Sequence, residues 1–276
     1  MKHTILITCP DMQGLVFNIS SILLKHGLNI ERNDEFVDKP SNQFFMRTVV
    51  NGNTNAAVLK ENLCTCLPSE AQINVIEEKK KSIIILCTKE NHCLGDLLLR
   101  YDSGELDVNI EAVISNHSNL QNLVGKFGID FFHISTEGIS REEHEKLVLE
   151  KCDEFNVDFL ALAKYMRILS PNFVEKYKNK IINIHHSFLP AFIGANPYKQ
   201  AYERGVKIIG ATAHFVNNHL DEGPIITQDI TKIDHTYSWQ DMQKAGRDVE
   251  KVVFARAIEL VLNDRVFIHG NKTVVF

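Results

Sequence analysis

The sequence lacks several features that would place a protein in a class at once. None of its apolar runs reaches the ~18 residues that span a bilayer, and its amino-terminal segment has no signal-peptide core. The net charge of −5 provides no basic field for a nucleic acid, and the chain has neither a dinucleotide-binding glycine motif nor a P-loop. We therefore expect a cytoplasmic protein with no membrane, nucleic-acid or dinucleotide partner.

Cysteine occurs six times, but in no metal-binding pattern. There is no Cys-x-x-Cys pair, and the two nearest cysteines, Cys64 and Cys66, have no second ligand pair to complete a zinc site. We interpret the cysteines as free thiols of a reducing compartment, and we assign no nucleophilic role to Cys93. We expect no metal site and no cofactor.

At ~100–200 residues per domain, the chain of 276 residues suggests one large domain or two smaller ones. Its first part alternates apolar stretches in the order strand, helix, strand, strand, helix, strand. These segments are 4–9, 15–23, a strand from 28, then 44–50, 56–64 and 72–76. The βαββαβ order predicts a ferredoxin-like domain over residues 1–78, followed by a charged linker at 79–81.

The segment Asp11-Met-Gln-Gly14-Leu15-Val16, with Gly27-Leu-Asn29-Ile30 after it, resembles the ACT domain. This resemblance implies pairing between subunits in a homo-oligomer and a small amino acid as effector. Asp11, Gly14 and Asn29 are then the regulatory candidates. Met12-Gln13 stands where many relatives carry Arg-Pro, and the residues alone allow a simpler reading in which Asp11 caps a helix and Gly14 permits a turn.

From Ser82 onward, buried strands alternate with helices. The predicted strands are 83–87, 108–115, 131–134, 157–163 and 181–185. Ser140, with Glu143 three residues later, is a capping box for a helix over 141–155, and a long amphipathic helix is expected over 238–262. The alternation predicts an α/β domain over 82–276 with a Rossmann-like, mainly parallel sheet and a site at the carboxyl ends of its strands.

The stretch from Asn183 to Pro224 carries the chemistry. If residues 181–185 are a strand, Asn183 and His185 point to the same face, because strand side chains alternate. The turn residues around Gly223 can bring Asp221 back towards them. An amide that stabilises an oxyanion, an imidazole that moves a proton and a carboxylate that orients the imidazole suit acyl-group chemistry.

The segments from Asn183 to Pro190, His214-Phe-Val, and Leu220-Asp221-Glu-Gly223-Pro224 closely resemble the signature of the folate-dependent formyltransferase family. The resemblance covers residues 82–276. It implies that Asn183 and protonated His185 stabilise a tetrahedral oxyanion, and that Asp221 holds His185 and helps to deprotonate the attacking group. It also implies supporting or substrate-binding positions at Ser187, Thr212 and His214, and a pterin-binding loop at Met166, Arg167, Ile168 and Leu169.

The loop after strand 83–87 helps to distinguish a transferase from a hydrolase. The family's purine-pathway transferases hold a phosphate with a glycine-bearing loop, whereas residues 88–93 here contain no glycine and include Glu90. The chain thus resembles family members that hydrolyse 10-formyltetrahydrofolate to formate and tetrahydrofolate. Their activity balances one-carbon pools and supplies formate for purine synthesis. The folate is the substrate and not a cofactor.

Two alternatives stay open on the sequence alone. One is a formyltransferase that acts on an unphosphorylated amine. The other is an amino-acid-sensing binding protein whose second domain has lost catalysis, although the presence of Asn183, His185 and Asp221 disfavours it.

Overall fold

The computed structural model describes residues 1–191 and 196–276, which form two compact units. The first unit consists of Met1–Lys79 together with Asn263–Phe267 and Val274–Phe276, and the second of Lys80–Leu262 with Ile268–Thr273. Within the described residues, no helix has both the length and the apolar character needed to cross a membrane.

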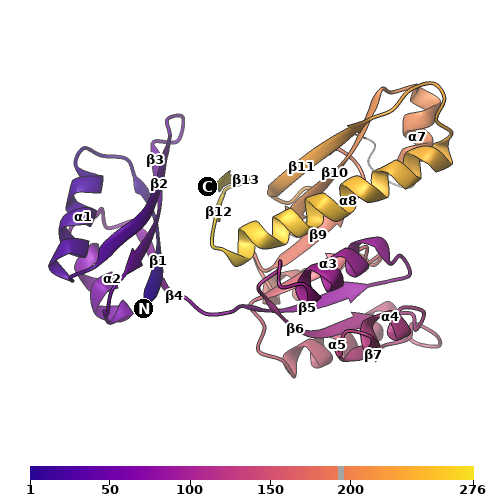
Figure 1. Cartoon of the computed structure of the whole chain (residues 1–276), viewed down its shortest axis with the longest axis horizontal. Coiled ribbons are helices and arrows are strands. Elements are labelled where there is room, and N and C mark those ends of the chain that lie inside the picture. Colours follow the sequence, from indigo (N-terminus) through magenta and orange to yellow (C-terminus); the bar gives the residue numbers. More distant parts are fainter. Residues whose placement is uncertain (192–195) are drawn as a thin grey trace. The chain divides into compact units, whose positions relative to one another are not determined.

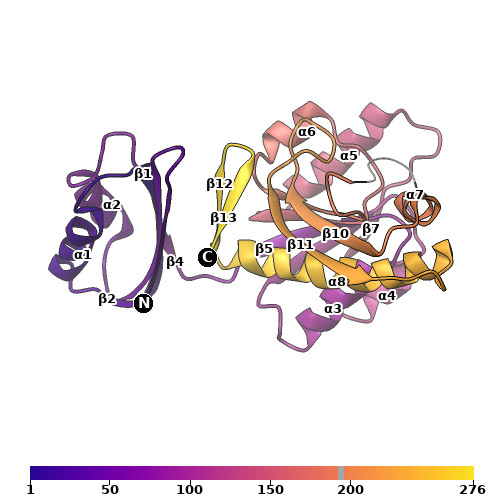
Figure 2. The same ribbon diagram turned by 90° about the horizontal axis from the view of Figure 1, so that it is seen from above.

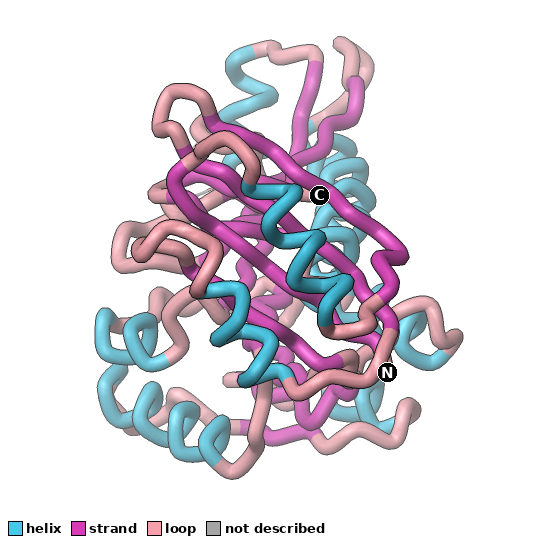
Figure 3. Tube along the Cα trace, turned by 90° about the vertical axis from the view of Figure 1, so that its left-hand side faces the viewer, coloured by secondary structure: helices cyan, strands magenta, loops and turns pink. Residues whose placement is uncertain are grey.

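The first unit has the predicted ferredoxin-like order of elements. They are β1 (Lys2–Pro10), α1 (Leu15–Lys25), β2 (Asn29–Asp38), β3 (Gln43–Asn51), α2 (Ala56–Cys64) and β4 (Gln72–Glu77). The strands form an antiparallel sheet of order β2-β3-β1-β4. Figure 3 shows both helices lying across one face of this sheet. Their buried apolar residues belong to the same core cluster as those of the strands.

The start of α1 corrects the simpler reading of this region. The N-cap residue is Gly14 in the left-handed conformation, with φ of 89°, and no side chain caps the helix. Asp11 lies three residues earlier, where its N–H donates to the carbonyl of Asn42 at 2.8 Å. The turn thus depends on the backbone freedom of glycine and not on a carboxylate cap.

The second unit is built on a seven-stranded sheet of order β11-β10-β9-β8-β5-β6-β7. Its elements are β5 (Ser82–Cys87), α3 (His92–Asp102), β6 (Asn109–Ser115), α4 (Gln121–Gly125), β7 (Phe131–His133), α5 (Arg141–Asp153), β8 (Phe159–Ala163), α6 (Pro171–Lys176), β9 (Ile181–His185), α7 (Pro197–Arg204), β10 (Ile208–Phe215), β11 (Ile225–Lys232) and α8 (Trp239–Leu262). Strands β5 to β9 pair in parallel, as predicted. The hairpin β12 (Val266–His269) and β13 (Lys272–Val275) follows α8.

Helices cover both faces of this sheet. In Figure 2, α5 and α6 lie on one side, and α3 and α8 on the other. The residues of β5 read as a continuous apolar run because both of its faces are buried in this way. Ser140 caps α5 as predicted, since its Oγ accepts a hydrogen bond from the N–H of Glu143 at 3.1 Å.

The sequence pattern does not indicate that the sheet ends in antiparallel strands. β10 pairs antiparallel with both β9 and β11, and the ladder between β10 and β11 shifts its register between Ala213 and His214. Figure 1 shows β9, β10 and β11 beside the long helix α8. This edge matters because it places β10 against the strand that carries Asn183 and His185.

Candidate active site

The pairing of β9 with β10 sets the floor of the site. Asn183 lies directly opposite His214, and His185 lies opposite Thr212. Asn183 and His185 are two residues apart on one strand, so their side chains share a face, as predicted. The same alternation on β10 places His214 on that face as well.

A tight return of the chain after β10 brings Asp221 to His185. A Cβ atom on Gly223 would lie 1.7 Å from the carbonyl oxygen of Phe215, so only glycine fits there. The N–H of Phe215 donates to the carbonyl of Pro224 at 2.9 Å and closes the loop. Asp221 has a φ of 57°, and its Oδ1 lies 3.2 Å from Nδ1 of His185.

The carboxylate of Asp221 is held in its ionised form. Burial raises the pKa of Asp221, but the hydrogen bond from His185 and the nearby imidazoles of His185 and His214 outweigh burial and lower it overall. Because a carboxylate can only accept, Nδ1 of His185 carries the proton in this pair. Nε2 of His185 is buried and has no hydrogen-bond partner among the described residues.

His214 orients the amide of Asn183. Nδ1 of His214 donates to the carbonyl of Phe215 at 2.8 Å, so its Nε2 is left as an acceptor. That Nε2 lies 3.2 Å from Nδ2 of Asn183 and accepts one of the two amide N–H donors. Burial lowers the pKa of His214, which keeps it neutral and able to accept. Asn183 therefore has its second N–H in a fixed direction.

These groups face a cavity of about 320 Å³. Asn183, His185, His214 and Asp221 line it. Its other walls come mostly from the loop after β8 and from the loop after β10, with Leu162 of β8 and Ile184 of β9. The apolar members are Leu162, Tyr165, Met166, Ile168, Leu169, Ile184, Val216 and Leu220. The cavity thus combines an amide, two imidazoles and a carboxylate with an apolar lining.

The loop that carries the four predicted pterin-binding residues is firmly held. Met166, Arg167, Ile168 and Leu169 all line the cavity. Met166 N–H donates to Oγ1 of Thr88 at 3.0 Å, and the carbonyl of Ile168 accepts from Nη2 of Arg141 at 2.5 Å. The carbonyl of Ile168 thus already has a protein donor, whereas the side chains of Met166 and Ile168 are exposed.

Thr212 and Ser187 are placed differently from the other predicted residues. Thr212 is completely buried, and its hydroxyl donates to the carbonyl of Ser187 at 2.9 Å and accepts from the N–H of Leu189 at 3.0 Å. Gln228 donates to the same hydroxyl at 2.9 Å. Thr212 therefore fixes the loop that follows His185. Oγ of Ser187 is buried and has no partner among the described residues.

Comparison with known proteins agrees with this arrangement. Residues 81–258 match the formyl transferase family and residues 3–61 the ACT domain. The chain is 56% identical to a formyltetrahydrofolate deformylase of Haemophilus influenzae over 99% of both chains. The chain belongs to the formyltetrahydrofolate deformylase family. It is also 54% identical to the deformylase of Escherichia coli K12, over 97% of this chain and 95% of the relative.

Solved structures show the same relation. A formyltetrahydrofolate deformylase from Pseudomonas syringae superposes with a TM-score of 0.94 at 39% identity, covering 100% of this chain and 95% of that one. A glycinamide ribonucleotide transformylase from Symbiobacterium toebii has a TM-score of 0.69 at 28% identity, and the match covers 73% of this chain and 96% of that one. The transformylase thus matches only part of this deformylase-family chain.

The three regulatory candidates of the ACT unit do not meet within one chain of this deformylase-family protein. Asp11 follows the end of β1 that pairs with Gln43, and Gly14 begins the next helix. Asn29 pairs with Asn51 at the other end of β3. The two ends of that nine-residue strand are about 26 Å apart at 3.3 Å per residue.

A buried network that was not predicted from the sequence includes Lys164, which lines the same cavity as His185. Glu250 on α8, only 1% exposed, accepts hydrogen bonds from Nε2 of His92 at 2.8 Å and from Oη of Tyr198 at 2.6 Å. Nζ of Lys164 lies 3.2 Å from the same carboxylate. Burial alone would raise the pKa of Glu250, but these donors lower it to about 2. Two features of the sequence are consistent with such a network: Lys164 at the end of a buried strand, and a glutamate, Glu250, within an apolar helix face.

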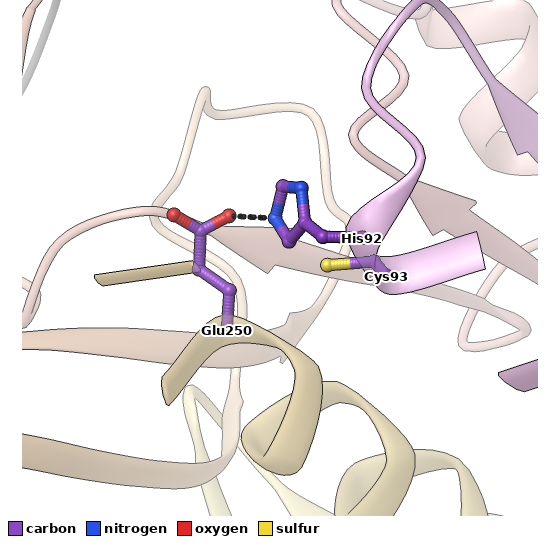
Figure 4. Close-up of side chains that lie close together, drawn as sticks. All are labelled: His92, Cys93 and Glu250. Carbon is purple, nitrogen blue, oxygen red and sulfur yellow. Dashed lines mark hydrogen bonds and ion pairs between the residues drawn. The ribbon is translucent and has the colours of Figure 1, made fainter. Parts of the chain in front are cut away.

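Three members of this region could hold a metal ion by distance alone. The ligand atoms of His92, Cys93 and Glu250 lie within 4.8 Å of one another, the one such group found in residues 1–191 and 196–276 (Figure 4). However, both oxygens of Glu250 already have protein donors, and burial raises the pKa of Cys93 well above its ordinary value, so the thiol keeps its proton. We therefore assign this group to the hydrogen-bond network.

Proposed function

We propose that the protein hydrolyses 10-formyltetrahydrofolate to formate and tetrahydrofolate, and so balances one-carbon pools and supplies formate for purine synthesis. The near full-length similarity to formyltetrahydrofolate deformylases supports this proposal. The single observation that carries it concerns His185, which lines the cavity. Its Nδ1 is held by Asp221, whereas its Nε2 has no hydrogen-bond partner among residues 1–191 and 196–276.

The first step is attack of water on the formyl carbon. Asp221 pairs with His185 through Oδ1, and its carboxylate is suited to accept a proton from the water. As the oxygen of the formyl group becomes negative, the second N–H of Asn183 and the Nε2–H of the imidazolium of His185 donate to it. These donors are fixed before the reaction, so little reorganisation is needed at the transition state.

The second step breaks the carbon–nitrogen bond. The electron pair of that bond returns to the folate nitrogen, which takes up a proton through His185 or a water. The product acid then loses its remaining proton and leaves as formate. The two hydrogens of the attacking water are thereby divided between tetrahydrofolate and the solvent, and the reaction is balanced without any further reactant.

The slot beside these groups is suited to the pterin ring. Its apolar walls at Met166, Ile168 and Leu169 can cover the two faces of a flat ring. Main-chain groups of the same loop can pair with the donors and acceptors along the ring edge. The hydrogen bonds of this loop to Thr88 and Arg141 would fix the position of the pterin ring, and so hold the formyl group within reach of His185.

The decisive experiment is a turnover assay with 10-formyltetrahydrofolate and no amine, in which both products are measured. We expect formate and tetrahydrofolate in equal amounts. His185→Ala should reduce kcat about 10²- to 10³-fold, which is the usual cost of one lost donor to an oxyanion. Asp221→Asn should reduce kcat at least as much, because it removes the base as well as the partner of His185.

Lys244→Gln is the matched control for these variants. Lys244 is an exposed residue of α8 that does not line the catalytic cavity, so its variant should retain the activity of the unaltered enzyme. Release of products only when an amine is added would contradict hydrolysis and indicate a transferase. Unchanged kcat in His185→Ala would contradict the assigned role of His185.

We further propose that the ACT unit assembles copies of the chain and takes a small amino acid. The match of residues 3–61 to the ACT domain supports this. Because Asp11 and Asn29 lie at opposite ends of β3, a ligand that touches both needs a second copy of the chain. Light scattering of the purified protein tests the assembly, and thermal shifts with single amino acids test the ligand. A monomer at every concentration would contradict the assembly.

A further inference from the structure

A second cavity of about 470 Å³ adjoins the catalytic one. The two cavities share three lining residues, namely Lys164, Met166 and His186. The remaining walls of the second cavity come mostly from α7 and α8 and include Trp239 and Arg247. Asn183, His185 and Asp221 do not line it. The second cavity is therefore distinct from the catalytic one and adjoins it at these three shared residues.

The charges that line the second cavity favour a small anion. Two carboxylates, Glu90 and Glu250, face it, and both are already paired. Glu250 lies 3.2 Å from Lys164, and Glu90 lies 3.5 Å from Nε of Arg247. Against these two carboxylates stand three cations, Lys164, Lys199 and Arg247. The lining thus has one positive charge in excess, that of Lys199, whose ammonium lies 3.9 Å from Glu203, a residue that does not line the cavity.

Lys164 stands where an anion would pass from one cavity to the other. It directly follows β8, lines both cavities and is only 4% exposed. Its ammonium has three N–H donors, and the pairing with Glu250 needs only one of them. Glu250 is itself held by His92 and Tyr198, so the position of the ammonium is fixed from behind.

We propose that the second cavity is the exit site for the formate released in the catalytic cavity, with Lys164 and Arg247 binding its carboxylate. This inference rests on the proposed hydrolysis. Tetrahydrofolate would still occupy the slot between the loops after β8 and β10 when formate forms. The anion would then leave past His186 into the second cavity, where the excess positive charge is located.

The single tryptophan of the chain provides a direct test. Trp239 lines the second cavity but not the catalytic one, and it is 40% exposed. Its fluorescence should change saturably when the ligand-free protein is titrated with sodium formate at constant ionic strength, relative to sodium chloride. Acetate in a parallel titration shows whether the site takes small carboxylates as a class. Because no turnover occurs, this binding is measured independently of hydrolysis.

Three variants decide the outcome. Lys164→Gln should weaken formate binding about tenfold or more, because it removes a charge-assisted hydrogen bond in a buried place. Arg247→Gln, at a partly exposed position, should weaken it several-fold, and it serves as the test if Lys164→Gln does not fold. Lys244→Gln, with the same loss of charge on the same helix outside the cavity, should bind formate normally.

Product inhibition gives a second readout in the turnover assay. Formate should inhibit the unaltered enzyme, and Arg247→Gln should need several-fold more formate for the same inhibition. The absence of a saturable response of Trp239 to formate would overturn the exit site, even if the protein hydrolyses 10-formyltetrahydrofolate. A response that is equal in Lys164→Gln, Arg247→Gln and the unaltered protein would also overturn it. A protein without hydrolytic turnover would instead overturn the proposed function.

Discussion

At the scale of single residues, hydrogen bonds determine which ring nitrogen of each histidine donates to the protein. The carbonyl of Phe215 accepts a hydrogen bond from Nδ1–H of His214, which leaves Nε2 of His214 as an acceptor for Asn183. The carboxylate of Asp221 accepts a hydrogen bond from Nδ1–H of His185 in the same way. Each imidazole thus has one nitrogen committed to the protein. The second nitrogen of His214 orients an amide, and that of His185 has no partner in the part of the chain that the structure describes.

Replacing His214 with phenylalanine tests whether it positions Asn183. Without an acceptor, the amide of Asn183 can turn, and its second N–H is no longer fixed. We expect His214→Phe to lower kcat about ten- to a hundredfold, less than the loss of a whole oxyanion donor, with little change in KM. His214→Gln retains an acceptor near the place of Nε2 and should recover much of kcat. Equal kcat values in the two variants would argue against a positioning role.

His186 predicts a pH dependence of stability. Burial and the nearby Lys164 lower the pKa of His186 from 6.5 to about 4. Between these two pH values the unfolded chain binds a proton that the folded chain does not, so the free energy of unfolding decreases as the pH falls from 6.5 to 4. One such group contributes a slope of about 1.4 kcal/mol per pH unit within that window.

Urea denaturation across this window checks the prediction. His186→Phe retains an aromatic ring beside His185 and Tyr198 but cannot take up a proton. We expect the loss of stability on acidification to be smaller in this variant than in the unaltered protein. His235→Phe, which changes an exposed histidine, is the control and should keep the full slope. An unchanged slope in His186→Phe would show that His186 does not cause it.

At the scale of elements, the packing of α7 against α8 depends on a missing side chain. A Cβ atom on Gly246 would lie 2.1 Å from Oη of Tyr198, the hydroxyl that donates to Glu250 at 2.6 Å. The glycine thus makes room for the tyrosine in the buried network. From the sequence, Gly246 is only an unfavourable residue within a predicted helix, since the reason for it comes from another helix.

Substituting alanine at two helical glycines separates packing from helix propensity. Gly246→Ala should lower the free energy of unfolding by about 1–3 kcal/mol, because Tyr198 must move. Gly95→Ala on α3 places its Cβ in open space and should raise the stability by roughly 0.5–1 kcal/mol. Chemical denaturation of both variants gives the comparison. Stabilisation by Gly246→Ala would contradict the close contact with Tyr198.

The elements also show how far the sequence could predict the structure. The parallel strands β5 to β9 and the face shared by Asn183 and His185 follow from local pattern, because each depends on periodicity within one segment. The contact of His214 with Asn183 could not be predicted in this way. It requires the antiparallel register between β9 and β10, which two strands fix together. The same holds for Glu250, whose three partners come from different parts of the chain.

At the scale of the whole molecule, the end of the chain belongs to the unit at its beginning. Arg47 on β3 is buried and donates from Nε to the carbonyl of Asp264 at 3.0 Å and from Nη2 to that of Asn263 at 2.9 Å. The ring of Phe45 contacts that of Phe267, with centroids 5.7 Å apart. No local pattern in the sequence indicates these contacts, because they join residues more than 200 positions apart.

This arrangement predicts that the first unit depends on Arg47. Arg47→Met removes the donors to two carbonyls and should lower the free energy of unfolding of the first unit by roughly 1–3 kcal/mol for each carbonyl that water cannot reach. Arg32→Met is the matched control, since Arg32 lies on the neighbouring strand, is half exposed and pairs with Asp34 at 2.7 Å. An exposed ion pair of this kind contributes about 1 kcal/mol or less.

Calorimetry can follow the two units in one experiment. Arg47→Met should lower the temperature of a transition that Arg32→Met leaves nearly unchanged. Hydrolysis at moderate temperature should keep its kcat, because Arg47 belongs to the first unit and does not line the catalytic cavity, which is formed by the second. If both variants lowered the transition equally, the contacts of Arg47 with Asn263 and Asp264 would not stabilise the first unit. If kcat fell with the transition, the second unit would depend on the first for its catalytic geometry.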